Sequence, residues 1–166
     1  MNYKEIQGDL FRSIRFVNGK VEPIFDEVPI YCHCIANDGL YGKGIAPVFI
    51  DQVFKSGDIV KSVLAQDPWT GKGKVYACST KSDDGTKTIY QAHLITKECT
   101  FGKPTYETLY QALMSLRAYI NQNKDITTIR MPKIGSGIDK LEWDKVKEII
   151  QGVFGSMDIN IVVYYL

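Results

Sequence analysis

The segment 126–166, ITTIRMPKIGSGIDKLEWDKVKEIIQGVFGSMDINIVVYYL, changes its hydrophobic period twice. Residues 126–134 carry the β-branched and apolar side chains typical of a strand, and residues 143–154 have the spacing of an amphipathic helix. Residues 160–166 return to a strand pattern. A strand, a helix and a strand joined by short loops favour parallel pairing, with the helix covering one face of a sheet. This segment therefore predicts an α/β fold.

The same alternation extends toward the N-terminus. Residues 28–36 (VPIYCHCIA) predict a strand, and apolar residues at helical spacing follow from residue 44 to residue 54, then again over 58–66. Strand patterns at 74–80 and 88–96 flank the turn signal at Asp83–Gly85, which predicts a hairpin and hence a mixed sheet. Residues 105–121 follow Pro104 and form the clearest helix pattern. We expect a mainly parallel sheet with helices on both faces.

Length and composition limit the classes of protein to consider. The 166 residues, 45% hydrophobic and 23% charged, fit one globular domain spanning 1–166, and this size is compatible with a monomer. A net charge of +1 argues against binding nucleic acid by charge alone. No apolar run predicts a signal peptide or a membrane span, so we expect a cytoplasmic protein that has no membrane partner.

The cysteines and histidines do not form a metal motif. The four cysteines include no CxxC pair, and two histidines are too few for a convincing zinc site. Cys32 and Cys34 are two residues apart on a predicted strand, so we expect them to share one face as small core residues. His33 and His93 also fall on predicted strands and are interpreted as core or edge residues. We expect no metal and no cofactor.

Two strand-to-helix junctions are rich in glycine: residues 39–46 (GLYGKGIA) and residues 132–139 (PKIGSGID). Glycine lets backbone amides approach an anion, and a helix N-terminus adds roughly half a positive charge. Two such loops at neighbouring strand ends can hold a diphosphate. Either loop alone also fits a purely structural turn. Neither matches GxGxxG or GxxxxGK[ST], which argues against a dinucleotide-binding Rossmann site and a P-loop.

Polar residues gather at the same predicted strand ends. Asn37 and Asp38 precede the first loop, Thr96 and Lys97 end the strand at 88–96, and Asp139 ends the second loop. A lysine beside a carboxylate can have a shifted pKa, attack a sugar carbon, or form an ion pair. Taken alone, Lys97 reads as a solvated lysine at a strand end and Asp139 as a helix cap.

Together, the motifs resemble the macrodomain family. The blocks are GDLF at 8–11, HCIAN at 33–37, GKGIA at 42–46, LITK at 94–97, KPTYE at 103–107, MPKIGSGIDKLEW at 131–143 and VYYL at 163–166. They look like the branch that contains the terminal ADP-ribose protein glycohydrolase and the macrodomain antitoxins of bacterial DNA ADP-ribosylating toxins. The blocks keep the family's order and span almost the whole chain.

The resemblance implies a three-layer α/β/α fold around a mixed, roughly six-stranded sheet. It implies hydrolysis of C1″-linked ADP-ribose conjugates, with ADP-ribosyl-glutamate on protein, ADP-ribosylated thymidine on DNA and O-acetyl-ADP-ribose as candidate substrates. Lys97 would attack C1″ of the distal ribose to form a lysyl intermediate, and Asp139 would open the ribose and assist proton transfer. The expected ligand-binding residues are Asp9 at the adenine amine, Leu10, Asn37, Gly42, Lys43, Gly44, Ile45, Ala46, Thr96, Gly135, Ser136, Gly137, Ile138, Tyr164 and Leu166.

Some features depart from that branch and leave alternatives open. Asn37 stands where the glycohydrolase branch often has an acidic residue, and residues 37–46 also resemble the yeast-type ADP-ribose-1″-phosphate phosphatases. A reader that binds ADP-ribose without turnover would have the same fold. Tyr164 fits a core-packing last strand as well as an adenine-lining role. Residues 67–86 match no family pattern and form either a lid or a longer hairpin.

Overall fold

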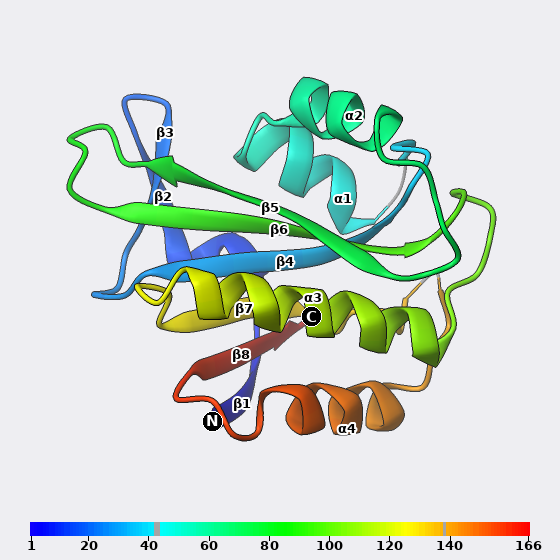
Figure 1. The fold of residues 1–166 in the computed structure, drawn as a ribbon. Helices are drawn as coiled ribbons and strands as arrows, with labels where there is room; N and C mark the ends of the chain where they lie inside the picture. Colours follow the sequence, from blue (N-terminus) through cyan, green and yellow to red (C-terminus); the bar gives the residue numbers. More distant parts are fainter. Residues whose placement is uncertain (42–43, 138) are drawn as a thin grey trace.

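The computed structural model describes residues 1–41, 44–137 and 139–166. Its centre is a six-stranded sheet in the order β1-β8-β7-β4-β6-β5 (Figure 1). The strands are β1 (Asn2–Gln7), β4 (Pro29–Ala36), β5 (Lys74–Lys81), β6 (Thr88–Lys97), β7 (Thr128–Pro132) and β8 (Asn160–Tyr165). All neighbours pair in parallel except β5, which runs antiparallel to β6 at one edge. The predicted mixed, six-stranded sheet is confirmed.

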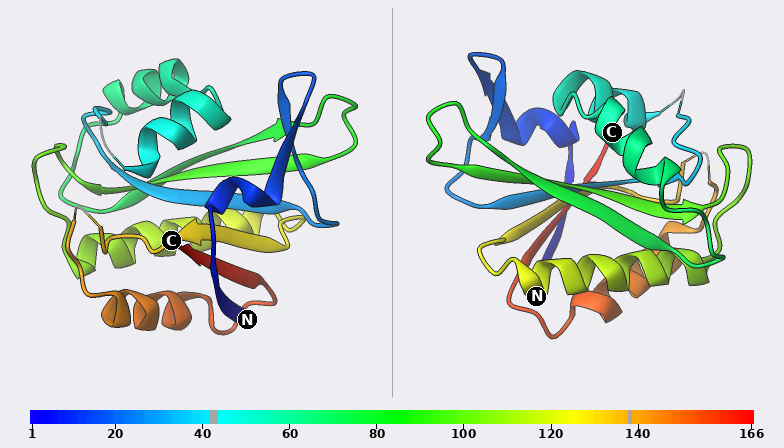
Figure 2. Two further views of the ribbon diagram at one scale, coloured as in Figure 1. Left: turned by 180° about the vertical axis from the view of Figure 1, so that it is seen from behind. Right: turned by 45° about the horizontal axis from the view of Figure 1, so that its top comes forward.

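Helices cover both faces of this sheet (Figures 1 and 2). One face carries α3 (Tyr106–Gln122) and α4 (Trp143–Phe154). The other carries α1 (Ile45–Pro47), the π-helical turn η2 (Val48–Val53) and α2 (Gly57–Ala65), together with the 3-10 turn η1 (Leu10–Ser13) and a small hairpin of β2 (Ile14–Val17) and β3 (Lys20–Pro23). The predicted three-layer α/β/α architecture is confirmed.

The hydrophobic core is divided by the sheet into two clusters. Side chains alternate along each strand. Cys32 on β4 and Leu94 on β6 therefore pack toward α3 and α4, while Tyr31 and Ile95 on the same strands pack toward η2 and α2. All four are essentially inaccessible to solvent. The near-continuous apolar runs in β4 and β6 follow from burial on both faces.

The first strand, β1, and the helix predicted from residue 44 differ from the sequence prediction. β1 was not predicted, because it is an edge strand whose residues are mostly polar and only partly buried. The helix predicted from residue 44 splits into α1 and η2, and the wider π turn buries Ile50 in place of Val48. Residues 74–81 form β5 and residues 82–87 form the turn to β6, so the greater part of the segment 67–86 belongs to the β5–β6 hairpin, and residues 67–73 precede it. Within the described ranges, no helix has the length and apolar character to cross a bilayer.

Two buried histidines form a hydrogen-bonded pair between β4 and β6. His33 Nε2 lies 2.6 Å from His93 Nδ1, and His93 Nε2 lies 3.1 Å from Oε1 of Gln91. Oε1 of Gln91 also accepts from Ser56 Oγ at 2.8 Å. Burial lowers the pKa of His93 to about 3, and burial together with the neighbouring imidazole lowers the pKa of His33 well below its ordinary value. Both rings are therefore neutral in the folded protein at physiological pH.

This pair predicts acid sensitivity of the fold. Unfolded histidines take up protons near pH 6.5, whereas the folded rings resist protonation, so stability falls as pH drops from about 6.5 toward the folded pKa values. We expect the free energy of unfolding to fall by about 1.4 kcal/mol per pH unit for each histidine. Urea unfolding between pH 7.5 and 5, above the ordinary titration of carboxylates, measures this slope. A stability that does not change with pH in this interval would contradict it.

Gly73 marks a close approach between the start of β5 and helix α3. A Cβ atom built at this position would lie 1.8 Å from the backbone oxygen of Thr108, and the Gly73 amide donates to Oε1 of Gln111 at 2.8 Å. Gly73→Ala should therefore destabilise the protein by about 3 kcal/mol, because backbone must move. Gly152→Ala in α4 is the matched control: apart from the backbone of its own helix, no atom of the described residues lies within 4 Å of its added Cβ. That variant should gain about 0.5–1 kcal/mol in thermal or chemical unfolding. Equal effects of the two substitutions would refute the steric argument.

Candidate active site

The carboxyl ends of five parallel strands meet at one edge of the sheet. β4 pairs with β7 only from Pro29–Thr128 to Tyr31–Arg130. Beyond these pairs β4 continues beside β6, and β7 continues beside β8, so the two central strands separate toward their carboxyl ends. Such a switch point, where chain connections leave in opposite directions, is where open α/β sheets bind ligands. The predicted site residues follow the ends of these strands.

Lys97 and Asp139 form an ion pair across this opening. Lys97 ends β6, Asp139 lies in the loop after β7, and Nζ is 2.8 Å from Oδ1. The side chains are 11% and 13% exposed, so water reaches both only narrowly. A partly buried amine and carboxylate in contact can exchange a proton. The pair predicted from two motifs far apart in sequence is thus brought together.

An irregularity in β6 sets the position of Lys97. Ile35 pairs with Ile95, but the next β4 residue, Ala36, pairs with Lys97, so Thr96 is an extra residue in the ladder. A bulge of this kind re-aims the side chains that follow it and is common beside active sites. The Asn37 amide continues the pairing by donating to the Lys97 carbonyl at 2.9 Å. Lys97 is therefore held through the backbone of β4.

Two buried polar atoms beside this ladder have no hydrogen-bond partner within the ranges that the structure describes: Asn37 Oδ1 and Thr96 Oγ1. The amide nitrogen of Asn37 donates to the carbonyl of Asp67 at 3.1 Å, which fixes the side chain and leaves the oxygen unsatisfied. A buried polar atom without a partner costs about 1–3 kcal/mol, so these positions favour a polar ligand. Both residues were predicted to bind one.

Asp38 braces the loop that follows Lys97. Its carboxylate accepts hydrogen bonds from the Thr100 amide at 2.8 Å, from the Thr100 hydroxyl at 2.9 Å and from the Leu40 amide at 3.0 Å. The Thr100 hydroxyl also lies 2.7 Å from the Leu40 carbonyl. The loops after β4 and β6 are consequently tied to each other at the site. The role of Thr100 was not predicted, because residues 98–102 form an irregular loop without a recognisable pattern.

The second glycine loop has a defined turn geometry. Gly135 has a φ of 72°, which strains any other residue, and an added Cβ would also lie in tight contact with Leu141 Cδ1, at 3.0 Å. The Leu141 amide donates to the Gly135 carbonyl at 2.7 Å, and Ser136 Oγ donates to the Lys133 carbonyl at 2.8 Å. Glycine is thus required at 135 by the turn itself. At Gly137, an added Cβ would meet no atom of the described residues within 4 Å, apart from its neighbours in the chain.

The first glycine loop is described only in part. Gly42 and Lys43, like Ile138 of the second loop, lie outside the described residues. Gly44 has a φ of 76° and precedes α1, while Ala46 is buried in the core and Ile45 is only partly exposed. Within the described part of this loop, the backbone of Gly44 and Ile45 lies at the start of helix α1.

The remaining predicted binding residues lie at the ends of β1 and β8. Asp9 caps η1, its Oδ1 accepting from the Phe11 amide at 2.9 Å, and Leu10 is buried in the core. Tyr164 is 3% exposed, its hydroxyl accepts from Arg130, and it belongs to the same buried cluster as Leu10 of η1. Leu166 is 96% exposed at the chain end. These positions border the carboxyl edge without reaching the Lys97–Asp139 pair.

Cys34 lies beside the ion pair, which the sequence did not predict. It is on β4, the strand between β6 and β7, and is partly exposed, whereas Cys32 is fully buried. Burial and the charge of Asp139 raise the pKa of the Cys34 thiol, and the charge of Lys97 opposes this increase. The thiol is therefore neutral and is not a competing nucleophile. The sequence contained one signal for this placement: Cys34 lies two residues before the end of its strand, on the face that it shares with Cys32.

Comparison with known proteins identifies the class of this fold. The macrodomain of Mycobacterium tuberculosis DarG superposes with a TM-score of 0.76 at 21% identity, covering 99% of this chain and 97% of that chain. Thermosipho africanus DarTG in complex with ADP-ribose gives a TM-score of 0.72 at 16% identity, covering 98% of this chain and 41% of that chain. The architecture is thus the macrodomain fold.

Sequence comparison adds the family. No family model matches the chain. It is, however, 37% identical over 134 residues to the ADP-ribose glycohydrolase OARD1 of Bos taurus and equally to that of Homo sapiens. The alignments cover 81% of this chain and 80% of each relative. The chain belongs to the macrodomain family, and the resemblance inferred from its motifs is confirmed.

Proposed function

We propose that this macrodomain binds ADP-ribose and hydrolyses conjugates linked through C1″ of the distal ribose. The observation that carries the proposal is the 2.8 Å contact between Lys97 Nζ and Asp139 Oδ1 at the carboxyl edge of the sheet. The relative of this chain, OARD1, is named as an ADP-ribose glycohydrolase, and the structure of DarTG, which has a similar fold, is that of a complex with ADP-ribose. A de-ADP-ribosylating hydrolase fits both the relatives and the pair.

The proposed reaction starts with a proton transfer. Attack on carbon requires a neutral amine, so a proton leaves Nζ of Lys97, and Asp139 Oδ1 is the acceptor within hydrogen-bond distance. Nζ then forms a bond to C1″ while the bond from C1″ to the leaving group breaks. The leaving group takes the bonding electrons together with the proton that Asp139 accepted. Asp139 then moves a proton from Nζ to the ring oxygen, and the bond between C1″ and the ring oxygen opens to give a protonated Schiff base. Water subsequently adds to C1″, the bond to Nζ breaks, and free ADP-ribose leaves with the lysine regenerated.

The other site residues would orient the ligand. Asn37 Oδ1 and Thr96 Oγ1, both buried and unsatisfied within the described part of the chain, suit the hydroxyl groups of the distal ribose. Backbone amides around Gly44 and Gly135–Gly137 suit the diphosphate. Asp9 would accept from the adenine amine through the carboxylate oxygen that does not cap η1. The expected partners are ADP-ribosylated proteins or ADP-ribosylated DNA.

A panel of conjugates tests this function. The purified chain is incubated with ADP-ribosyl-glutamate peptide, ADP-ribosylated thymidine in an oligonucleotide, O-acetyl-ADP-ribose and ADP-ribose-1″-phosphate, and released ADP-ribose is quantified. We expect turnover of at least one ester or base conjugate. Release from ADP-ribose-1″-phosphate alone would identify a phosphatase. Binding of ADP-ribose by calorimetry without turnover of any conjugate would identify a reader and refute the hydrolase.

A further inference from the structure

A groove on the η1 side of the sheet lies away from the Lys97–Asp139 pair, and Tyr164, one of the expected ligand-binding residues, forms part of its wall. Its larger part is a cavity of about 450 Å³ lined by Lys4, Ile6, Arg12, Ile24, Phe25, Arg130 and Tyr164. A smaller cavity of about 240 Å³ shares Lys4 and Arg130 with it and extends toward Asn2 and Asn160, the first residues of β1 and β8. The groove therefore runs toward the amino ends of these strands, whereas Lys97 and Asp139 lie at the carboxyl edge. Cavities that bind small ligands have about 300–1,000 Å³.

The charge of this groove is positive. Of its three cations, Arg130 is neutralised by a bidentate ion pair with Glu27. Nε of Arg130 lies 2.7 Å from Oε2 of Glu27, and Nη2 lies 2.5 Å from Oε1. Lys4 and Arg12 form no ion pair with a carboxylate among the described residues. Arg12 donates from Nη1 to the Gln7 carbonyl at 3.2 Å, which orients its guanidinium and leaves donors to spare. Two uncompensated cations at one cavity favour an anion such as a phosphate.

The groove also offers an aromatic surface. Phe25 is 51% exposed, although its ring lies 5.1 Å from the Arg130 guanidinium. The same guanidinium lies 6.0 Å from the ring of Tyr164, so Arg130 contacts both rings from a buried position. Phe25 is thereby held at the wall of the cavity with half of its surface free. An exposed ring held in place suits stacking against a planar group.

We propose that this groove binds a nucleoside monophosphate unit, with its phosphate at Lys4 and Arg12 and its base on Phe25. Charge alone would also suit an acidic peptide, but a carboxylate leaves the exposed ring of Phe25 without a partner. The unit is either a free nucleotide or one residue of a single-stranded nucleic acid, because both present the same phosphate and base. The site is independent of ADP-ribose hydrolysis and does not rest on it.

The test uses the full chain with ADP-ribose at a concentration just sufficient to saturate the proposed active site, because ADP-ribose itself contains a nucleoside monophosphate unit and an excess would compete for the groove. Binding of thymidine 5′-monophosphate by calorimetry and of a fluorescein-labelled oligothymidylate by anisotropy separates the free nucleotide from the strand. Phe25→Ala should weaken binding about tenfold, because stacking of one base contributes about 1–3 kcal/mol. Lys4→Gln and Arg12→Gln should each weaken it severalfold and make it less dependent on salt.

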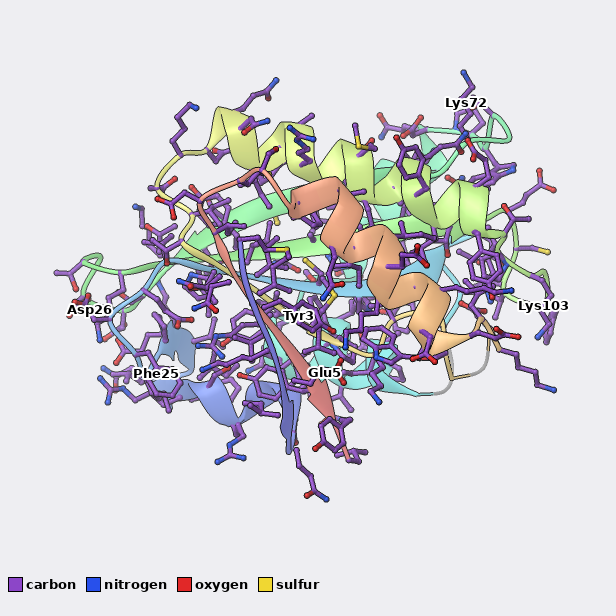
Figure 3. All side chains as sticks on the ribbon, turned by 90° about the horizontal axis from the view of Figure 1, so that it is seen from below. Tyr3, Glu5, Phe25, Asp26, Lys72 and Lys103 are labelled. Atoms are coloured by element: carbon purple, nitrogen blue, oxygen red, sulfur yellow. The ribbon has the colours of Figure 1, made fainter. Side chains whose placement is uncertain are left out.

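Matched controls lie outside the groove. Phe16 on β2 is 52% exposed and does not line either cavity, so Phe16→Ala removes an equally exposed ring. Lys72 lies at the far end of the molecule from Phe25 (Figure 3), so Lys72→Gln removes one charge elsewhere. Both controls should bind the probes as the unaltered protein does. ADP-ribose affinity should stay unchanged in every variant.

Three outcomes would overturn the proposal. The first is that neither thymidine probe binds when ADP-ribose is present. The second is that Phe25→Ala and Phe16→Ala affect binding equally. The third is that a polyglutamate peptide binds as tightly as the oligothymidylate and is insensitive to Phe25→Ala, which would identify an acidic-peptide site. Failure of the hydrolase assay does not affect these three outcomes, because they concern the binding of probes in the groove and not turnover at Lys97 and Asp139.

Discussion

Lys97→Arg should reduce hydrolysis of C1″ conjugates by at least about 1,000-fold, which corresponds to about 4 kcal/mol in activation free energy. Arginine keeps the positive charge and can keep an ion pair with Asp139, but a guanidinium is not deprotonated in proteins and cannot attack carbon. The variant therefore separates nucleophilic attack from charge. Steady-state rates on the substrate that the unaltered protein turns over fastest give the measurement.

The control for this variant is the binding of ADP-ribose. Calorimetry should give an affinity within severalfold of the original value, because the charge beside the distal ribose is retained. Asp139→Asn should lower the rate by a similar factor, since the amide cannot accept a proton from Nζ of Lys97. Near-normal turnover by Lys97→Arg would mean that the lysine is only an ion-pair partner, and the proposed mechanism would be wrong.

Glu27→Gln should destabilise the fold by about 3–5 kcal/mol, because it leaves the guanidinium of Arg130 buried without a counter-charge. The side chains of Glu27 and Arg130 are 9% and 7% exposed. Burial by itself lowers the pKa of Arg130, but the hydrogen bonds and charge of Glu27 outweigh it and raise the pKa. The pair ties the segment before β4 to the centre of β7. Chemical unfolding monitored by circular dichroism measures the change.

An exposed ion pair provides the comparison. Lys145 lies 3.6 Å from Glu142 with both side chains more than half exposed. Lys145→Gln should change the free energy of unfolding by less than about 0.5 kcal/mol. If Glu27→Gln were no more destabilising than Lys145→Gln, the buried pair would contribute little to holding β7 in the sheet.

Hydrophobic periodicity predicted the strongly buried parts of the fold. β4, β6, α3, β7, α4 and β8 are packed on one or both faces, so their apolar spacing is clear in the sequence. β1 escaped prediction because it pairs on one side only and its side chains are largely polar. The π turn of η2 was missed for another reason: its residues per turn differ from the 3.6 assumed by a helical pattern.

The active-site prediction rested on matching motifs, since no local pattern links Lys97 to Asp139. The pair depends on strand order: β4 lies between β6 and β7, and the loop after β7 reaches across its end. The bulge at Thr96 and the brace from Asp38 to Thr100 have no sequence signature, because each arises from the register of neighbouring strands. The roles of all the site residues remain predictions, and Gly42, Lys43 and Ile138 also lie outside the described residues.

Trapping the lysyl intermediate tests the central claim most directly. A substrate is mixed with the protein and a hydride donor, which reduces the opened sugar–lysine adduct to a stable secondary amine, and the modified peptide is mapped by mass spectrometry. The account predicts one ADP-ribosyl adduct on Lys97 and none in Lys97→Arg. Turnover with no adduct at Lys97, or with an adduct at a different lysine that persists in Lys97→Arg, would contradict it.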